Sequence, residues 1–304
     1  MAPDTSRRKP QEITRENIGQ FMEQFDTIIS DCDGVLWMPL PIPNTREALA
    51  KLREAGKKVL FVTNNALVEP DFKFKTFGYP LGKDEVTYPP HAIQKYLQKI
   101  GFNKKVFVIG STHYRDYLQK HGMEIVPATR TGGLVEENLK VMLGELDEDL
   151  EIGAVIIEAD INVNYMDITK AVNHLRRPDC LFLAGATDTL LPTFDNGKVL
   201  IGPGYFIRAI EDMSGRKAHV FGKPGPAMVT DYLKEIHGVD LQRAVFVGDS
   251  LDSDMGIANA CGMKKLLVLT GLTQFKDLDT CKPELIPDFY IKSFGDFAEL
   301  LTQK

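Results

Sequence analysis

Short apolar runs alternate with amphipathic segments along most of this chain, and the alternation limits the folds that it can adopt. The apolar runs have the length of buried strands. We expect strands at residues 27–30, 59–62, 106–109, 154–157, 181–184, 219–221, 244–247, 266–269 and 289–291. Apolar spacings of three and four predict helices at residues 48–52, 93–100, 168–175 and 229–236. Strands and helices that alternate in this way indicate an α/β fold with parallel sheets.

Four of the predicted strands end in residues that can carry chemistry. The sequences that follow them are Asp31-Cys32-Asp33-Gly34, Thr63-Asn64-Asn65, Gly222-Lys223-Pro224 and Gly248-Asp249-Ser250. Ligands of open parallel sheets bind outside the carboxyl ends of the strands, so these four ends predict a site. The three strands between residues 104 and 204 end in less reactive residues. At 304 residues the chain is long enough for two domains.

We therefore predict an inserted domain over residues 104–204. It interrupts a core made of residues 21–103 and 205–304, which follows a polar N-terminal tail of residues 1–20.

The spacing of Asp31 and Asp33 raises a question of charge. Residues two apart in an extended chain point to one side, where two carboxylates repel each other unless a cation, a proton or solvent intervenes. A solvated turn would explain this pair alone, as it would Thr63-Asn64-Asn65, and Lys223 alone would suit an exposed loop. Asp249 and Asp254 alone would suit a helix N-terminus. None of these separate explanations accounts for all four groups of residues at the ends of predicted strands, so the combination favours a functional site.

An oxygen-rich cluster of this kind suits Mg²⁺ and a phosphate group. One carboxylate can then attack phosphorus, while a second serves as general acid and base.

The composition excludes several other classes of partner and compartment. The formal net charge is −6 and no long basic run occurs, so neither a nucleic acid nor a membrane surface is expected as a partner. No apolar stretch approaches the roughly 20 residues of a membrane span. The polar N-terminal residues do not resemble a secretory signal. The four cysteines form no C-x-x-C pair. We therefore expect reduced thiols, Cys32 among them, and a cytoplasmic location.

Four sequences, "DCDGVLW", "FVTNN", "GKPGP" and "VGDSLDSDMGIANACGM", resemble the motifs of the haloacid dehalogenase-like phosphatases. The resemblance runs from about residue 21 onward. It is closest to the branch of p-nitrophenyl phosphatases, phosphoglycolate phosphatases and pyridoxal-phosphate phosphatases. It implies a Rossmann-like parallel-sheet core with an inserted α/β cap domain that closes over the site and usually mediates a homodimer. It also implies a phosphoric monoester hydrolase that uses Mg²⁺ and acts on a small phosphorylated metabolite.

The resemblance implies a role for each residue of the motifs. Asp31 would be the nucleophile and Asp33 the general acid and base. The implied metal ligands are Asp31, Asp33 through its backbone carbonyl, Asp249 and Asp254. The implied phosphate-binding residues are Thr63, Asn64, Asn65 and Lys223. In the insertion, the loop at residues 185–192 presents Asp188, which we expect to contact the leaving group or brace the loop.

The chain departs from the family pattern where substrates would be recognised. Ala66 stands where this branch commonly has Ser, and Leu67-Val68-Glu69-Pro70 stand where basic residues commonly follow. The sequence Ala184-Gly185-Ala186-Thr187-Asp188 keeps the acid of an A-T-N-x-D loop and loses its asparagine. Leu190 and Leu191 replace a basic residue and a histidine that occur in related phosphatases. The sequence therefore leaves the physiological substrate open.

Two other functions also fit the residues. One is a non-catalytic phosphate-binding or signalling protein. The other is a phosphotransferase or phosphomutase on the same scaffold.

Overall fold

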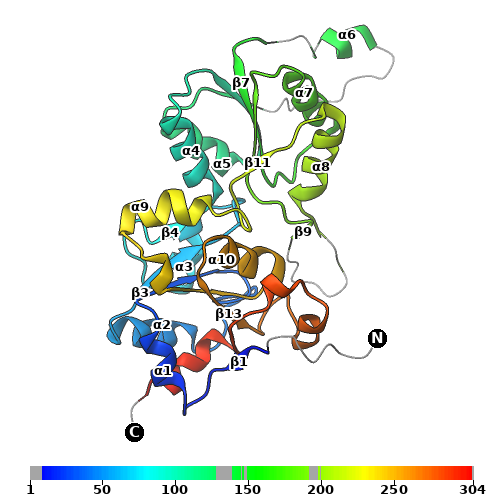
Figure 1. The fold of residues 1–304 in the computed structure, drawn as a ribbon. Coiled ribbons are helices and arrows are strands. Elements are labelled where there is room, and N and C mark those ends of the chain that lie inside the picture. The colour runs from blue at the N-terminus through cyan, green and yellow to red at the C-terminus, as the bar shows by residue number, and fades with distance from the viewer. Residues whose placement is uncertain are drawn as a thin grey trace. The chain divides into compact units, whose positions relative to one another are not determined.

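A computed structural model describes residues 9–127, 139–144, 146, 149–191, 198 and 200–302. The chain divides into two compact units (Figure 1). The first unit contains residues 1–63, 70–88 and 223–304, and the second contains residues 64–69 and 89–222. The predicted insertion, residues 104–204, lies inside the second unit.

The first unit is built on a seven-stranded parallel sheet. Its strands, in spatial order, are β1 (Gln11–Glu12), β14 (Phe289–Ile291), β13 (Lys264–Val268), β12 (Ala244–Gly248), β2 (Thr27–Ser30), β3 (Lys58–Val62) and β4 (Val86–Thr87). Every residue of β2 and β12 is buried, as expected where helices cover both faces of a parallel sheet. The apolar sequence of β12 and the two adjacent isoleucines of β2 are consistent with this burial.

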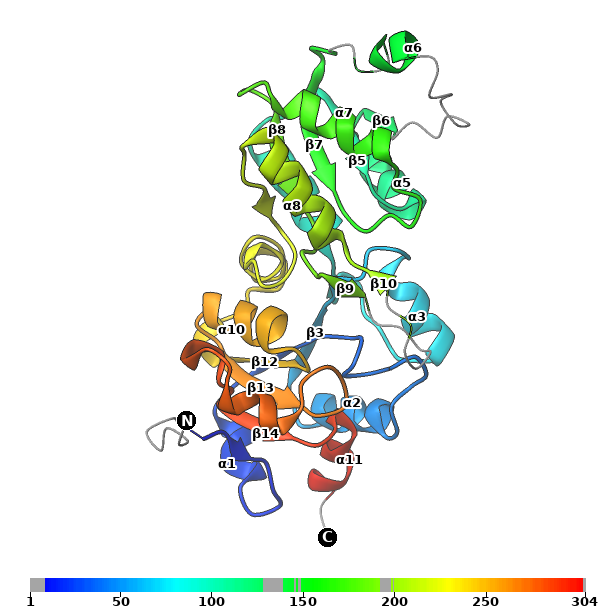
Figure 2. The same ribbon diagram turned by 90° about the vertical axis from the view of Figure 1, so that its right-hand side faces the viewer.

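Helices cover both faces of this sheet. The α-helices of the first unit are α1 (Ile18–Glu23), α2 (Thr45–Glu54), α3 (Pro70–Phe77), α9 (Lys234–His237), α10 (Gly256–Ala260) and α11 (Phe297–Leu300). Its 3₁₀ and π turns are η1 (Met228–Leu233), η2 (Leu241–Arg243), η3 (Leu251–Met255), η4 (Phe275–Asp279), η5 (Pro283–Leu285) and η6 (Phe294–Asp296). Figure 2 shows α2 and α11 on one face and α10 on the other.

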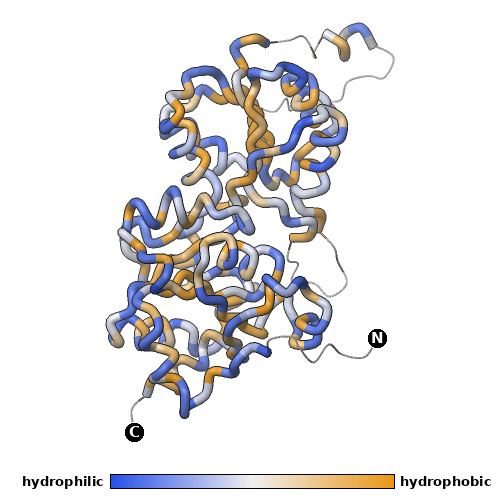
Figure 3. Tube along the Cα trace, viewed as in Figure 1, coloured by the Kyte–Doolittle hydropathy of each residue, from blue (hydrophilic) through white to orange (hydrophobic). Residues whose placement is uncertain are grey.

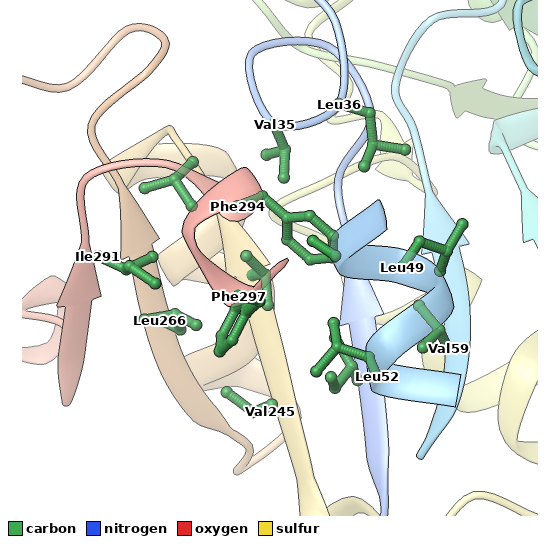
Figure 4. Close-up of a cluster of buried hydrophobic side chains, with 14 of the residues drawn as sticks. Val35, Leu36, Leu49, Leu52, Val59, Val245, Leu266, Ile291, Phe294 and Phe297 are labelled. Atoms are coloured by element: carbon green, nitrogen blue, oxygen red, sulfur yellow. The ribbon is translucent and has the colours of Figure 1, made fainter. Parts of the chain in front are cut away.

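The hydrophobic core lies between the sheet and these helices. Hydrophobic residues concentrate along the strands (Figure 3). Leu49 and Leu52 of α2 are fully buried and belong to the same hydrophobic cluster as Phe294 and Phe297 (Figure 4). Burying such a side chain stabilises the fold by roughly 1.5–3 kcal/mol. This packing supports the sheet whose strand ends carry the predicted site.

The N-terminal segment differs from our expectation of a polar tail over residues 1–20. Residues 1–8 lie outside the described part of the chain. Further along, β1 pairs in parallel with β14, and Ile13 and Ile18 are buried. Two isoleucines in a polar segment are enough to attach it to the core, although they form no recognisable periodicity.

The second unit contains a five-stranded parallel sheet. Its strands, in spatial order, are β11 (His219–Val220), β8 (Leu181–Ala184), β7 (Ile152–Ile157), β5 (Lys105–Ile109) and β6 (Ile125–Pro127). A separate antiparallel pair consists of β9 (Leu190–Leu191) and β10 (Leu200–Ile201). The helices are α4 (Pro89–Lys99), α5 (Thr112–Lys120), α6 (Leu139–Gly144), α7 (Tyr165–Leu175) and α8 (Pro203–Ser214). Ile207 and Ile210 of α8 belong to the hydrophobic core of this unit, so α8 is part of it.

The predicted α/β class with parallel sheets is confirmed, and a strand occurs at each of the nine predicted positions. Over the described residues, no helix combines the length and the hydropathy that a membrane span requires.

Candidate active site

Three neighbouring strands of the first unit bring predicted site residues together. The sheet order β12-β2-β3 places the carboxyl ends of these parallel strands side by side. Asp249 follows β12, Asp31 follows β2 and Thr63 follows β3. These three side chains therefore meet at one edge of the sheet, although more than 200 residues separate Asp31 from Asp249 in sequence.

A cluster of three buried carboxylates lies at this edge. Asp31, Asp249 and Asp254 each offer an oxygen, and the three oxygens lie within 4.8 Å of one another. Backbone N–H groups fix the side chains. The N–H groups of Asp249 and Ser250 both donate to Oδ2 of Asp254 at 3.0 Å, and the N–H of Cys32 donates to Oδ1 of Asp31 at 2.7 Å. The carboxylates are thus held together in spite of their mutual repulsion.

Lys223 supplies a positive charge to this cluster. Its Nζ lies 2.7 Å from Oδ1 of Asp31 and 2.8 Å from Oδ1 of Asp254, and its side chain is only 2% exposed. Burial alone would lower the pKa of Lys223, but the two aspartates reverse this and raise its pKa above the usual value. The lysine is therefore held in its charged form between two acids.

One ammonium does not neutralise three carboxylates. Burial raises the pKa of Asp31 well above its usual value; Lys223 opposes this shift, and Asp254 and Asp249 reinforce it. Burial, reinforced by Asp254, likewise raises the pKa of Asp249 to about 7. Three buried carboxylates beside one lysine make a site to which a further cation would be attracted. Hard carboxylate oxygens are the ligands that Mg²⁺ prefers, so the cluster fits that ion.

Three glycines leave the space that the carboxylates occupy. A Cβ atom on Gly34, whose φ is +84°, would lie 2.5 Å from Cγ of Asp249, and one on Gly271 would lie 1.8 Å from its Oδ2. A Cβ atom on Gly248 would lie 2.3 Å from Cγ of Asp254. Real Cβ contacts are not this short, so any side chain at these positions would displace a carboxylate. Glycine at these three positions is therefore required for the carboxylates to lie where they do.

Asp33 lies beside this cluster in sequence, but its side chain has other partners. Oδ1 of Asp33 lies 2.5 Å from Nζ of Lys73 and accepts a hydrogen bond from Nε1 of Trp37 at 3.1 Å. The carboxylate of Asp33 is not a member of the buried cluster. Its predicted contact with the metal is through the backbone carbonyl and is compatible with this arrangement.

The remaining predicted residues divide between the two units. Thr63 belongs to the first unit and is buried, and its N–H donates to the carbonyl of Thr87 at 3.1 Å. Asn64, Asn65 and Asp188 belong to the second unit. There, Nδ2 of Asn64 donates to Oδ2 of Asp188 at 2.8 Å. The structure thus joins two predicted residues that lie 124 positions apart in the sequence.

Comparison with known proteins gives a consistent result. A haloacid dehalogenase-like hydrolase family model matches residues 28–124, and a second, HAD-hydrolase-like model matches residues 220–297. Glycerol-3-phosphate phosphatase from Rattus norvegicus is 31% identical over 311 residues, which cover 95% of either chain. The chloroplastic phosphoglycolate phosphatase 1A of Arabidopsis thaliana is 34% identical over 289 residues, which cover 93% of this chain and 79% of the plant protein.

The chain belongs to the haloacid dehalogenase-like hydrolases. Among solved structures, the p-nitrophenyl phosphatase from Archaeoglobus fulgidus matches 91% of this chain and 99% of its own, with a TM-score of 0.74 and 27% identity. The predicted resemblance and the predicted fold class are confirmed by these matches. The prediction of a phosphoric monoester hydrolase agrees with the names of the relatives.

In this haloacid dehalogenase-like hydrolase, Glu158 is a buried acid that sequence analysis missed. It follows β7 in the second unit and is 2% exposed. Its Oε1 accepts the N–H of Ala159 at 2.8 Å, and its Oε2 accepts the N–H of Ala186 at 2.9 Å. A Cβ atom on Gly185 would lie 1.7 Å from Oε2 of Glu158. Glu158 therefore holds the loop that carries Asp188, and it requires glycine at position 185.

The contacts of Glu158 with Gly185 and Ala186 therefore accompany the departure from the family pattern at these two positions. Glu158 could have been found in the sequence as an acid that directly follows an apolar strand, but the ends of the strands between residues 104 and 204 look less reactive than the other four. Pro192, the predicted end of this loop, lies outside the described residues.

The protonation of Glu158 leads to a prediction on stability. Burial raises its pKa from 4.5 to about 8, so the folded chain keeps this proton while the unfolded chain loses it. The free energy of unfolding of the wild type should therefore fall as the pH rises from 4.5 to about 8, by up to about 1.4 kcal/mol per pH unit from this residue. Glu158→Gln should lose this contribution and keep the contributions of Asp31 and Asp249, whose pKa values are also raised. Urea unfolding of both proteins across this pH window measures the difference.

The design separates protonation from packing. Glu158→Gln loses a hydrogen-bond acceptor at every pH, which lowers its free energy of unfolding by a constant amount. The diagnostic quantity is therefore the difference in the free energy of unfolding between the two proteins, and how this difference changes with pH. Glu124→Gln, whose side chain is 72% exposed, is the matched control for the loss of a carboxyl group. Parallel stability curves for wild type and Glu158→Gln would refute the raised pKa.

Proposed function

We propose that this chain is a magnesium-dependent phosphatase that hydrolyses a small phosphomonoester through an aspartyl-phosphate on Asp31. The observation that carries the proposal is the buried Lys223, placed between Asp31 and Asp254 in the carboxylate cluster. A purely structural ion pair needs one partner for one lysine. A site that also binds a divalent cation needs the excess of carboxylates found here, because the cation and the lysine together balance the carboxylates and a bound phosphate.

The residues divide the chemistry between them. An oxygen of Asp31 attacks phosphorus and forms an acyl phosphate, and the P–O bond to the leaving alcohol breaks. Asp33, which must be protonated at the start of this step, donates its proton to the leaving oxygen and becomes a carboxylate. In the second step Asp33 takes a proton from the attacking water, and the phosphate leaves Asp31.

Other residues hold charge in place during both steps. Lys223 keeps Asp31 oriented and offers positive charge to the phosphate oxygens. The hydroxyl of Thr63, at the next strand end, would donate to a phosphate oxygen. Asp31, Asp249 and Asp254 would hold the Mg²⁺ ion together with the backbone carbonyl of Asp33. The bound ion would supply charge neutralisation, which is most of what phosphoryl transfer requires.

The names of the relatives suggest the size of the substrate. They refer to glycerol 3-phosphate and phosphoglycolate, which are small phosphate esters. We propose a substrate of this size for this chain. The cap role of residues 104–204, the substrate contacts of Asn64, Asn65 and Asp188, and the homodimer remain predictions from the resemblance.

Phosphate release from a panel of phosphate esters tests the proposal. The purified chain should release inorganic phosphate when Mg²⁺ is present, lose this activity after chelation and recover it when Mg²⁺ is restored. Ca²⁺ should not restore activity, because its larger and looser ligand shell alters the geometry around the nucleophile.

Two outcomes would contradict the proposal. Full activity after chelation, or with Ca²⁺ alone, would exclude the magnesium site. Transfer of phosphate to an added alcohol, without net release, would indicate a phosphotransferase instead.

A further inference from the structure

The general acid and base of the proposed function, Asp33, makes an ion pair within the first unit that the sequence does not suggest. Lys73 lies on α3, and its Nζ is 2.5 Å from Oδ1 of Asp33. The indole Nε1 of Trp37 donates to the same oxygen at 3.1 Å. Two donors from different parts of the unit thus converge on one carboxylate oxygen.

The loop after β2 fixes one of these donors. The N–H of Gly34 donates to the carbonyl of Trp37 at 2.8 Å, and an isolated β-bridge joins Asp33 to Trp37. This tight loop brings the indole next to the carboxylate. Trp37 itself is 2% exposed, so its ring has little freedom to turn away.

Aromatic packing fixes the other donor. Phe74, next to Lys73 on α3, is 1% exposed. Its ring packs edge-on against Trp37 with 5.1 Å between the ring centroids, and Tyr79 packs edge-on against Trp37 at 5.5 Å. The same contacts that attach α3 to the loop therefore direct Lys73 towards Asp33. The ammonium of Lys73 also lies 5.7 Å from the centroid of the Trp37 ring.

We propose that Lys73 is a positioning residue for Asp33, which keeps the carboxylate in the orientation needed for proton transfer. A general acid must lie within hydrogen-bond reach of the proton acceptor, and a charge-assisted hydrogen bond restricts its rotation. The inference rests on the proposed function, because it assigns Lys73 an effect only through Asp33. Partly exposed ion pairs add little to stability, and both side chains are 21% exposed, so loss of Lys73 should leave the fold intact.

A double-mutant cycle tests the inference. The variants are Lys73→Met, Asp33→Asn and the double variant, assayed with p-nitrophenyl phosphate and with glycerol 3-phosphate. Lys73→Met should lower kcat for glycerol 3-phosphate about tenfold, part of the 10²–10⁴-fold that general acid–base catalysis typically contributes. The loss should be smaller for p-nitrophenyl phosphate, whose leaving group needs less protonation. In the Asp33→Asn background, Lys73→Met should change kcat no further.

Two controls accompany the cycle. Lys73→Arg keeps the charge and should retain most of the activity. Lys75→Met removes the other lysine of α3, whose side chain is 74% exposed and pairs with Asp71, and should leave kcat unchanged.

Each alternative has its own signature. A rise in KM and in the inhibition constant of inorganic phosphate, equal for both esters, would show that Lys73 binds substrate and would overturn the inference. An equal loss of kcat in both backgrounds, or for both esters, would show a general structural role and would also overturn it. If Asp33→Asn alone keeps wild-type kcat with both esters, the acid role of Asp33 in the proposed function fails, whatever Lys73 does.

Discussion

Asp31→Asn is expected to reduce phosphate release by roughly 10⁴-fold or more, as for other enzymes that lose a covalent nucleophile. An amide neither attacks phosphorus nor offers an anionic oxygen to the carboxylate cluster. The side-chain volume is unchanged, and burial already disfavours the charge at this position, so the variant should fold. Turnover of p-nitrophenyl phosphate with Mg²⁺, alongside circular dichroism, measures both properties.

The matched control is Asp252→Asn. Asp252 lies between Asp249 and Asp254 in sequence but is exposed, so the same chemical change there should leave turnover unchanged. More than a trace of activity in Asp31→Asn would exclude Asp31 as the nucleophile.

Lys223→Met is expected to cause the largest loss of stability among the variants described. It removes the ammonium that lies within 2.8 Å of two buried carboxylates and leaves them without a counter-charge. Breaking a buried ion pair on one side typically costs about 3–5 kcal/mol. Urea unfolding in the absence of divalent cations measures the change in the free energy of unfolding, and phosphate release should also be lost.

Lys234→Met provides the comparison for this variant. Lys234 lies on α9 and is exposed, so its removal should change stability by less than about 0.5 kcal/mol. If Lys223→Met were as stable as wild type, the cluster would be neutralised by protonation and not by the lysine.

The strands that carry the site were predictable because they are buried. β12 and β8 are almost continuously apolar and β2 contains two adjacent isoleucines, since both faces of these strands are covered, and such runs are visible in a sequence. The two-residue strands β1 and β4 were missed because a strand of that length has no periodicity. Their pairing depends on the neighbours that they meet in the folded sheet.

The carboxylate cluster was predictable for a topological reason. Parallel strands end at one edge of the sheet, so Asp31 and Asp249 were expected to meet without knowledge of any contact. The ion pair between Lys73 and Asp33 was not predictable in this way. It depends on how Phe74 packs against Trp37, which is a matter of tertiary contacts and not of strand order.

The hydrophobic pattern of the sequence also does not determine where the second unit begins and ends. We placed them at residues 104 and 204, whereas the second unit extends from residue 89 to residue 222 and includes residues 64–69. α4 and α8 are amphipathic helices, and amphipathicity does not tell which of two sheets a helix will cover.

The contact between Glu158 and Gly185 has a consequence for redesign of the loop that precedes Asp188. The two positions share one volume, since a methyl group at residue 185 would coincide with a carboxylate oxygen of residue 158. Threonine, the residue typical of this loop position in the phosphatases that the chain resembles, therefore cannot be introduced at position 185 while Glu158 is present. The dependence runs in one direction: a residue larger than glycine becomes acceptable at position 185 only after Glu158 has been replaced by a smaller residue.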